Sequence, residues 1–231
     1  MKRILLLALV LSGVVYSFGQ KNFGIKIYQN TDFFETQYDN REMNLSTKVD
    51  QVNFSRFSLA FDLEGKKGYT HEIELLVPEF SKSLDKIQFP MSYKFRDVPW
   101  LVGEVSSYSV RYELNKTLTN KDKRFGFNLG LGINPYYVHI EYVPKIENAY
   151  DLSTKLYGFV LNAVPRATYR LSQRFSMDLN VPLKIYDLRG EKKRIKNPNI
   201  PRNQQETTEH SSIFFESAYT VRVGVMYKLN K

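Results

Sequence analysis

The residues best suited to chemistry lie near the C-terminus, in the run Glu209-His210-Ser211-Ser212. A serine becomes a nucleophile when a histidine within hydrogen-bond reach takes its proton and a carboxylate orients the ring. His210 and Ser212 are two residues apart and share one face of a strand, and Glu209 or Glu216 would supply the carboxylate. Short polar runs are also common where a loop enters a strand, and a polar rim is the simpler interpretation. The sequence therefore predicts no enzyme, with a hydrolase that uses His210 and Ser212 as the alternative.

Metal and cofactor chemistry has little material in this chain. It contains three histidines, His71, His139 and His210, and no cysteine. His139 and Glu141 share a strand face, but two side chains are too few for a metal site. We therefore expect no metal and no cofactor, and the absence of cysteine excludes disulfides and acylation at a cysteine.

Two segments have the composition of binding surfaces. Segment 188–211 holds six cations against three carboxylates, and its densest part contains Lys192, Lys193, Arg194 and Lys196. Such a cluster can bind lipopolysaccharide phosphates through charge-assisted contacts, although many charge runs are simply solvated loops. Segment 80–103 is apolar, with Phe89, Tyr93, Phe95 and Trp100, and apolar surface patches commonly mark interaction sites. We predict lipopolysaccharide binding for the first segment, and for the second a contact with another protein or a fold back over the end of the domain.

A third set of charges alternates with apolar residues along the chain. We predict ion pairing among Arg56, Asp62, Glu72, Glu74, Arg111, Glu113, Arg166, Arg170, Asp178 and Arg222. Their face also carries glycine, asparagine, serine and alanine, which fit the narrow interior of an eight-stranded barrel. Because a buried charge left alone is costly, this set must be almost fully paired. The pattern predicts a filled lumen and no open pore.

Eight segments of period-two hydrophobicity would position these side chains. We predict strands at about 22–29, 52–63, 69–77, 106–114, 125–133, 156–171, 175–186 and 213–229. In the fifth, apolar residues from Phe125 to Ile133 alternate with glycine and asparagine. Asn134-Pro135 then reverses the phase, and we predict a bulge that keeps the following alternate residues on the apolar face, namely Tyr136, Val138, Ile140 and Tyr142.

The links between these segments alternate in length. The links at 64–68, 119–124 and 171–173 are short, whereas those at 31–51, 80–103, 140–153 and 188–211 are long. Short turns at one rim and long loops at the other are typical of an up-and-down transmembrane barrel, with the short turns in the periplasm. Aromatic residues near the short-turn rim match an interfacial girdle, and they are Phe61, Tyr69, Phe125, Tyr169, Phe175 and Tyr227. A soluble β protein is the alternative.

The N-terminus has the pattern of a secretory signal peptide. Lys2 and Arg3 precede an apolar run from Ile4 to Val15, which is too short to span a membrane. Small residues then precede Gln20, so we predict a cleaved signal peptide over 1–19 and one barrel domain over 20–231. The formal net charge of +9 suits anionic lipid headgroups, and we expect no nucleic-acid partner for an exported protein.

The chain resembles the small eight-stranded outer-membrane barrels of Gram-negative bacteria, which are OmpA-type in architecture, and the "outer membrane protein beta-barrel domain" families. The resemblance lies in the strand alternation, the turn lengths and the closing segment Val223–Leu229. Such families commonly end on an aromatic residue, whereas this chain ends Leu229-Asn230-Lys231. The His210-x-Ser212 pair also resembles outer-membrane lipid A deacylases, but the residues after it, 213–218, lack the asparagine and Pro-Gly elements of that family.

Together these features predict an all-β, eight-stranded antiparallel transmembrane barrel in the cell outer membrane. The predicted role is non-enzymatic, either structural or in interaction with outer-membrane lipid, lipopolysaccharide and possibly another envelope protein. A barrel that binds or transports a small or lipidic ligand is the first alternative, and a lipid-modifying hydrolase is the second.

Overall fold

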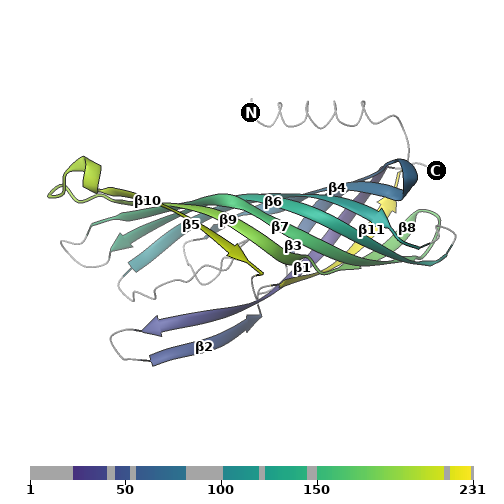
Figure 1. Ribbon diagram of the computed structural model, residues 1–231, viewed down its shortest axis with the longest axis horizontal. Helices are drawn as coiled ribbons and strands as arrows, with labels where there is room; N and C mark the ends of the chain where they lie inside the picture. The colour runs from purple at the N-terminus through teal and green to yellow at the C-terminus, as the bar shows by residue number, and fades with distance from the viewer. Residues whose placement is uncertain are drawn as a thin grey trace.

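The computed structural model is almost entirely β-sheet (Figure 1). It describes residues 23–40, 45–52, 56–81, 101–119, 123–144, 150–215 and 219–229, with only the backbone described for 32–40, 45–52 and a few strand ends. The strands are β1 Phe23–Asn40, β2 Leu45–Val52, β3 Arg56–Glu64, β4 Tyr69–Ser81, β5 Leu101–Thr117, β6 Phe125–Pro144, β7 Leu152–Arg170, β8 Phe175–Asn180, β9 Leu183–Ile195, β10 Glu206–Phe214 and β11 Tyr219–Lys228. Two short 3₁₀ turns occur, η1 at Lys66–Gly68 and η3 at Arg202–Gln204. No helix in these ranges is long and apolar enough to cross a membrane.

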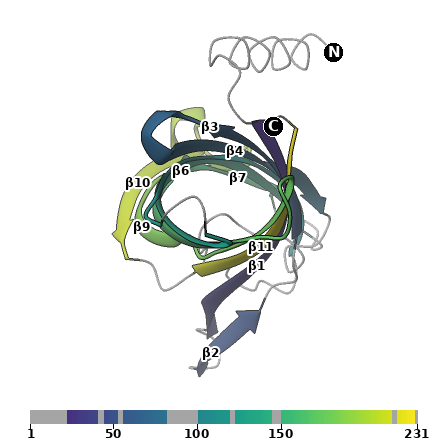
Figure 2. The same ribbon diagram turned by 90° about the vertical axis from the view of Figure 1, so that its right-hand side faces the viewer.

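The strands close into a ring, which Figure 2 shows end on. Each strand pairs antiparallel with the next around the cycle β1, β3, β4, β5, β6, β7, β8, β11 and back to β1. The closing pair sets Ile27 opposite Val225. Because every strand of the ring has two neighbours there, its backbone groups are satisfied without an exposed edge. The predicted eight-stranded antiparallel barrel is confirmed.

Three strands of the ring, β3, β8 and β11, are extended past it by a separate strand after a break in the strand. β9 continues β8 after Val181-Pro182, β10 precedes β11, and β2 precedes β3. Proline has no N–H for the ladder, so Pro182 ends the pairing of β8, and the amide of Val181 donates instead to the carbonyl of Pro165 at 3.2 Å. Beyond their breaks, β9 pairs with β7 and β10, whereas β2 pairs with the outer half of β1.

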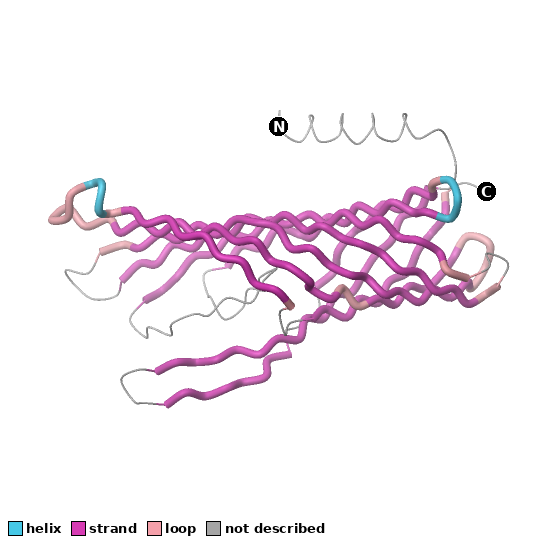
Figure 3. Tube along the Cα trace, in the orientation of Figure 1, coloured by secondary structure: helices cyan, strands magenta, loops and turns pink. Residues whose placement is uncertain are grey.

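The predicted short turns all lie at one end of the barrel, where β1 begins and β11 ends (Figure 3). They are 65–68, the described residues 118–119 and 123–124, and 171–174. In the first, Lys67 and Gly68 have φ of 58° and 76°, the left-handed region that glycine adopts most readily. In the third, the Ser172 hydroxyl oxygen accepts the backbone N–H groups of Arg174 and Phe175 at 3.2 and 3.0 Å.

The long connections are shorter than the sequence predicts, which corrects three predicted loops. β6 runs for 20 residues and β7 for 19, which leaves 145–151 between them. β9 and β10 take up most of segment 188–211, and β1 and β2 most of segment 31–51. Apolar alternation is the sequence signal for a strand, and it fades where both faces meet polar surroundings although the hydrogen-bonded ladder continues.

The predicted bulge at Asn134-Pro135 is wrong. β6 pairs with β7 in unbroken register from Phe125 opposite Tyr169 to Tyr142 opposite Leu152. Side chains therefore keep alternating, and Tyr136, Val138 and Ile140 point into the barrel, where they are buried. The phase of the sequence reverses because the interior changes from polar to apolar along the strand, and not because the backbone shifts.

The outer surface next to the short turns is an apolar belt. On β6, Phe125, Phe127, Leu129 and Leu131 are 47–67% exposed, whereas the glycines between them face inward. Aromatic rings edge the belt at the short turns, with Phe175 against Tyr227 at 5.0 Å between ring centroids. A second aromatic row follows about twelve residues along the strands, at Tyr108, Tyr137, Tyr157, Tyr186 and Phe214. This spacing approximates the ~9–11 residues with which a tilted strand crosses a bilayer, so the belt identifies a membrane-spanning barrel.

Candidate functional site

The lumen beside the apolar belt is filled by a network of charged side chains. Arg222 on β11 lies at its centre and is fully buried. Its guanidinium donates to Glu74 at 2.5 Å and to Glu113, and its Nε donates to Asn180. Its Cζ lies 5.0 Å from the centre of the Tyr28 ring. One cation therefore links carboxylates from two strands on the opposite wall.

Arg166 on β7 is the second cation that joins the network. Its two terminal nitrogens contact Glu72 at 2.6 and 3.0 Å, Glu113 at 2.6 Å and Asp178 at 3.0 Å. Arg111 on β5 donates to Glu74 at 2.7 Å. Planar guanidinium groups suit such forked contacts with carboxylates, and charge-assisted bonds are stronger than neutral ones.

Lys26 on β1 completes the network on the side nearer the short turns. Its ammonium lies 2.5 Å from Glu72, 2.8 Å from Asp62 and 3.4 Å from Asp178. The Tyr28 hydroxyl donates to both oxygens of Glu72, at 3.1 and 3.0 Å. The described cluster thus combines four cations with five carboxylates and links seven of the eight barrel strands.

β6 is the strand that gives this network space. A Cβ at Gly132 would lie 3.2 Å from the Glu113 side chain, and one at Gly130 would overlap the Asn115 amide oxygen. The inward glycines of the sequence therefore stand where carboxylate and amide side chains of β5 occupy the lumen. A charged side chain left without a pairing partner in so narrow an interior would carry a large desolvation cost.

The structure brings eight of the ten predicted lumen residues into this network or its direct contacts. Arg170 instead faces inward at the short-turn mouth, and the side chain of Arg56 lies outside the described part. Sequence reasoning missed Lys26, which is the one charged residue among the inward side chains that the structure describes on β1. Lys26 alternates in phase with the inward residues Gly24 and Tyr28, and this pattern in the sequence indicates that it faces the lumen.

A smaller polar cluster lies farther from the short turns. The Tyr136 hydroxyl donates to Asp187 at 2.9 Å, and Arg189 pairs with the same carboxylate at 2.6 Å. Beyond it the inward residues are mostly apolar, and the buried ones include Val105, Val138, Ile140 and Leu156. The part of the barrel outside the apolar belt is therefore built like a soluble barrel, with its apolar side chains inside.

The predicted catalytic pair is placed on the outer surface of β10. His210 and Ser212 lie opposite Gly190 and Leu188 of β9, and the His210 ring packs edge-on against Tyr157 at 6.5 Å. Same-face neighbours on a strand are about 7 Å apart at Cα, and no hydrogen bond joins these two among the described residues. Glu216 lies outside the described residues.

A serine does contact a histidine elsewhere, at His139 on β6. The His139 Nε2 lies 3.0 Å from the Ser153 hydroxyl and 3.6 Å from Glu141. A catalytic triad uses the two ring nitrogens separately, one for the serine and one for the carboxylate. Both neighbours share one nitrogen here, so the trio is a surface hydrogen-bond cluster. In the described ranges, no group of three or more His, Asp or Glu side chains is arranged to hold a metal ion.

The predicted lipopolysaccharide cluster lies at the end of β9 and not in a loop. Strand alternation divides it, because Lys192 and Arg194 face outward and Lys193 faces inward, where it pairs with Glu191 at 3.1 Å. Lys192 also pairs with Glu206 at 2.5 Å, and Lys196 lies 3.4 Å from Asp151. The predicted partner residues Phe89, Tyr93, Phe95 and Trp100 lie outside the described residues.

No protein-family model matches this chain, and no curated protein matches it. Solved structures that align with it include Ail, the attachment invasion locus protein of Yersinia pestis, at 9% identity and a TM-score of 0.44, over 91% of this chain and 100% of that one. A major outer membrane protein from Thermus thermophilus aligns at 10% identity and a TM-score of 0.45, over 89% and 99%. The outer membrane protease OmpT from Escherichia coli aligns at 11% identity and a TM-score of 0.36, over 92% and 98%. Likenesses this distant carry no conclusion about activity, and the barrel assignment rests on the strand pairing itself.

Proposed function

We propose that this protein is a non-enzymatic integral barrel of the bacterial outer membrane, with a structural or interaction role, exported through a cleaved signal peptide over residues 1–19. The observation that carries the proposal is the buried ion-pair network. Arg166 and Arg222 each bridge opposite walls of the lumen within the membrane-spanning part. A solute could pass only if these buried pairs were broken, which leaves charges uncompensated at a cost of several kcal/mol.

The transport alternative requires a passage where this network stands, and a conductance recording separates the two. The hydrolase alternative requires His210 to reach Ser212, and the two side chains lie side by side on one strand face with Tyr157 against the ring. Lipid A acyl chains that change on Ser212→Ala in cells would favour the hydrolase.

Outer-membrane lipid is the partner that the surface charges support. Lys192 and Arg194 face outward on β9 beyond the aromatic residue Tyr186, and Lys155 of β7 stands directly opposite Lys192. These three cations form an outward row past the apolar belt, toward the level of headgroup phosphates, and the row stays net positive although Glu206 pairs with Lys192. We propose that this row, without the inward Lys193, contacts lipopolysaccharide phosphates.

Strand alternation supplies a matched test of that contact. The outward variant Lys155→Gln/Lys192→Gln/Arg194→Gln should retain less lipopolysaccharide during purification than the wild type, and its retention should depend less on salt. The inward variant Lys193→Gln, on the same strand, should behave as the wild type. Equal retention by all three proteins would refute the proposed row.

An envelope protein is the second proposed partner, through the apolar residues Phe89, Tyr93, Phe95 and Trp100. A photo-crosslinker at position 95 or 100 in intact cells would capture such a partner directly. Crosslinks found only within the barrel would remove this part of the proposal.

A further inference from the structure

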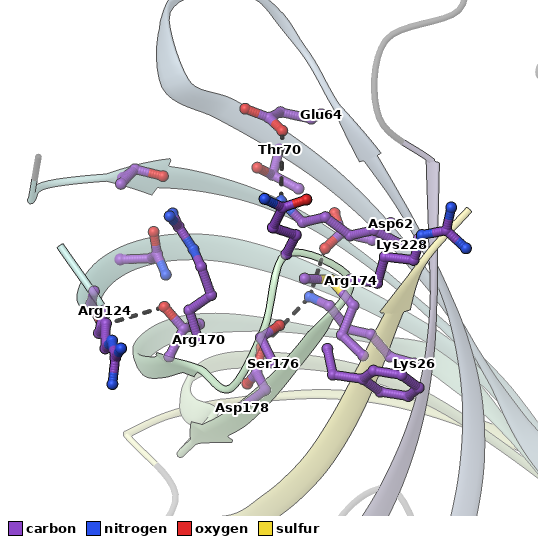
Figure 4. A pocket seen from close by; sticks show the side chains of 18 of the residues that line it. Lys26, Asp62, Glu64, Thr70, Arg124, Arg170, Arg174, Ser176, Asp178 and Lys228 are labelled. Carbon is purple, nitrogen blue, oxygen red and sulfur yellow. Dashed lines mark hydrogen bonds and ion pairs between the residues drawn. The ribbon is translucent and has the colours of Figure 1, made fainter. Parts of the chain in front are cut away.

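A pocket of about 170 Å³ opens at the short-turn mouth of the barrel (Figure 4). Its inner end is the Lys26 corner of the lumen network. Its walls come from strands on both sides and from turn residues Thr119, Lys123, Arg124 and 172–174. A single water needs only about 10–15 Å³ on this measure, so the pocket has room for a small polyatomic ion with its hydration.

The strand residues that line this pocket are balanced in charge. Three cations, Lys26, Arg170 and Lys228, stand with three carboxylates, Asp62, Glu64 and Asp178. Lys26 contacts Asp62 and Asp178, and Lys228 lies 3.9 Å from Glu64. The carboxylates of the wall are therefore already matched by cations of the wall.

The turns add cations without adding carboxylates among the described lining residues. Lys123, Arg124 and Arg174 belong to the lining, which gives six cations against three carboxylates. Like-charge side chains around one concave mouth raise the local potential, which attracts a multivalent anion.

The lining also offers neutral donors. The Ser172 hydroxyl oxygen accepts two backbone N–H groups, so its own hydrogen is available to a further acceptor. Arg174 belongs to the lining and donates through one terminal nitrogen to the hydroxyl of the outward-facing Tyr227 at 3.2 Å, which places this guanidinium at the rim of the mouth. Forked guanidinium donors beside hydroxyl groups are typical of phosphate recognition.

We propose that the short-turn mouth binds a phosphate group from the periplasmic side, with Lys123, Arg124 and Arg174 as the residues that hold it. The phosphate belongs either to a soluble compound or to a phospholipid headgroup of the inner leaflet. This site lies at the opposite end of the barrel from the outward cation row, and neither depends on the other.

Calorimetric titration of the folded full chain with pyrophosphate, in a zwitterionic detergent, tests the site. The variant Lys123→Gln/Arg124→Gln/Arg174→Gln should bind pyrophosphate roughly tenfold more weakly. Each charge contact near water adds little binding free energy alone, but the three contributions add up. The control Lys193→Gln/Lys196→Gln/Arg202→Gln removes the same charge from the other end and should bind as the wild type does. The double variant Lys123→Gln/Arg124→Gln keeps the Arg174 contact with Tyr227. It should also bind pyrophosphate more weakly than the wild type, so the test still holds if the triple variant folds poorly.

Absence of pyrophosphate binding by the wild type, or an equal loss in the mouth variant and the control, would overturn the proposal. Repeating the titration in bilayers identifies the source of the phosphate. Pyrophosphate that binds equally in zwitterionic and anionic bilayers points to a soluble ligand, and pyrophosphate that is displaced by anionic phospholipid points to headgroups.

Discussion

The Arg222 guanidinium contacts Glu74 and Glu113 on two different strands, and all three side chains are buried. Arg222→Met would leave both carboxylates without this partner, and we expect a loss of about 3–5 kcal/mol in the free energy of unfolding. Denaturant titration of the barrel in bilayers measures this value. Arg194→Met, at an exposed outward position, is the matched control and should cost less than about 0.5 kcal/mol. Similar losses in the two variants would contradict the central position of Arg222.

Two inward glycines on neighbouring strands make a second matched pair. A Cβ at Gly224 would overlap the Tyr28 ring, and that ring is held between Arg222 and its bonds to Glu72. A Cβ at Gly24 meets the flexible end of Met226 at 3.2 Å and lies in ordinary contact with the Asp62 Cβ at 3.5 Å. We expect Gly224→Ala to destabilise the barrel by about 1–3 kcal/mol and Gly24→Ala by clearly less, in the same denaturant titration. A loss in the free energy of unfolding that is no larger for Gly224→Ala than for Gly24→Ala would contradict this and show that the Tyr28 ring can move aside.

At the scale of elements, period-two alternation predicted each barrel strand beside the membrane, and the short turns were predicted within a few residues. Period-two alternation arises where one face of a strand meets apolar surroundings and the other meets polar ones. It therefore reveals a strand only where its two faces differ in this way. The reversal after Asn134 therefore suggests a shifted backbone, although it is the interior itself that becomes apolar at Tyr136 and Val138. The same limit hides the outer parts of β9 and β10, whose residues are polar on both faces.

Labelling of single cysteines tests the unbroken alternation of β6, because the chain contains no native cysteine. A membrane-impermeant maleimide should modify His139→Cys and Glu141→Cys in intact cells, since both side chains face outward beyond the belt. It should leave Val138→Cys and Ile140→Cys unmodified, because these positions are buried inside. The reverse pattern would restore the bulge at Asn134-Pro135.

At the scale of the whole molecule, two barrels of opposite polarity are stacked along the same strands. The part inside the apolar belt has charges within and apolar side chains outside, and the part beyond it has apolar side chains within. The membership of the lumen network was largely predictable, because a charge on the inward parity of a membrane strand has no other place to go. Which of these residues pair with one another was not predictable, since the pairing depends on which inward residues lie at the same height along the barrel axis. Lys26 and Arg166, far apart in sequence, meet through Glu72 for that reason.

The central claim is that this network closes the lumen. Planar-bilayer recording of the folded wild-type protein, with a general diffusion porin reconstituted in parallel as the positive control, tests it most directly. The network predicts a flat current trace at every applied voltage below bilayer rupture, because ions would have to separate the buried pairs of Arg166 and Arg222. Reproducible conductance steps from the wild-type protein, at a protein concentration where the porin also conducts, would contradict the claim.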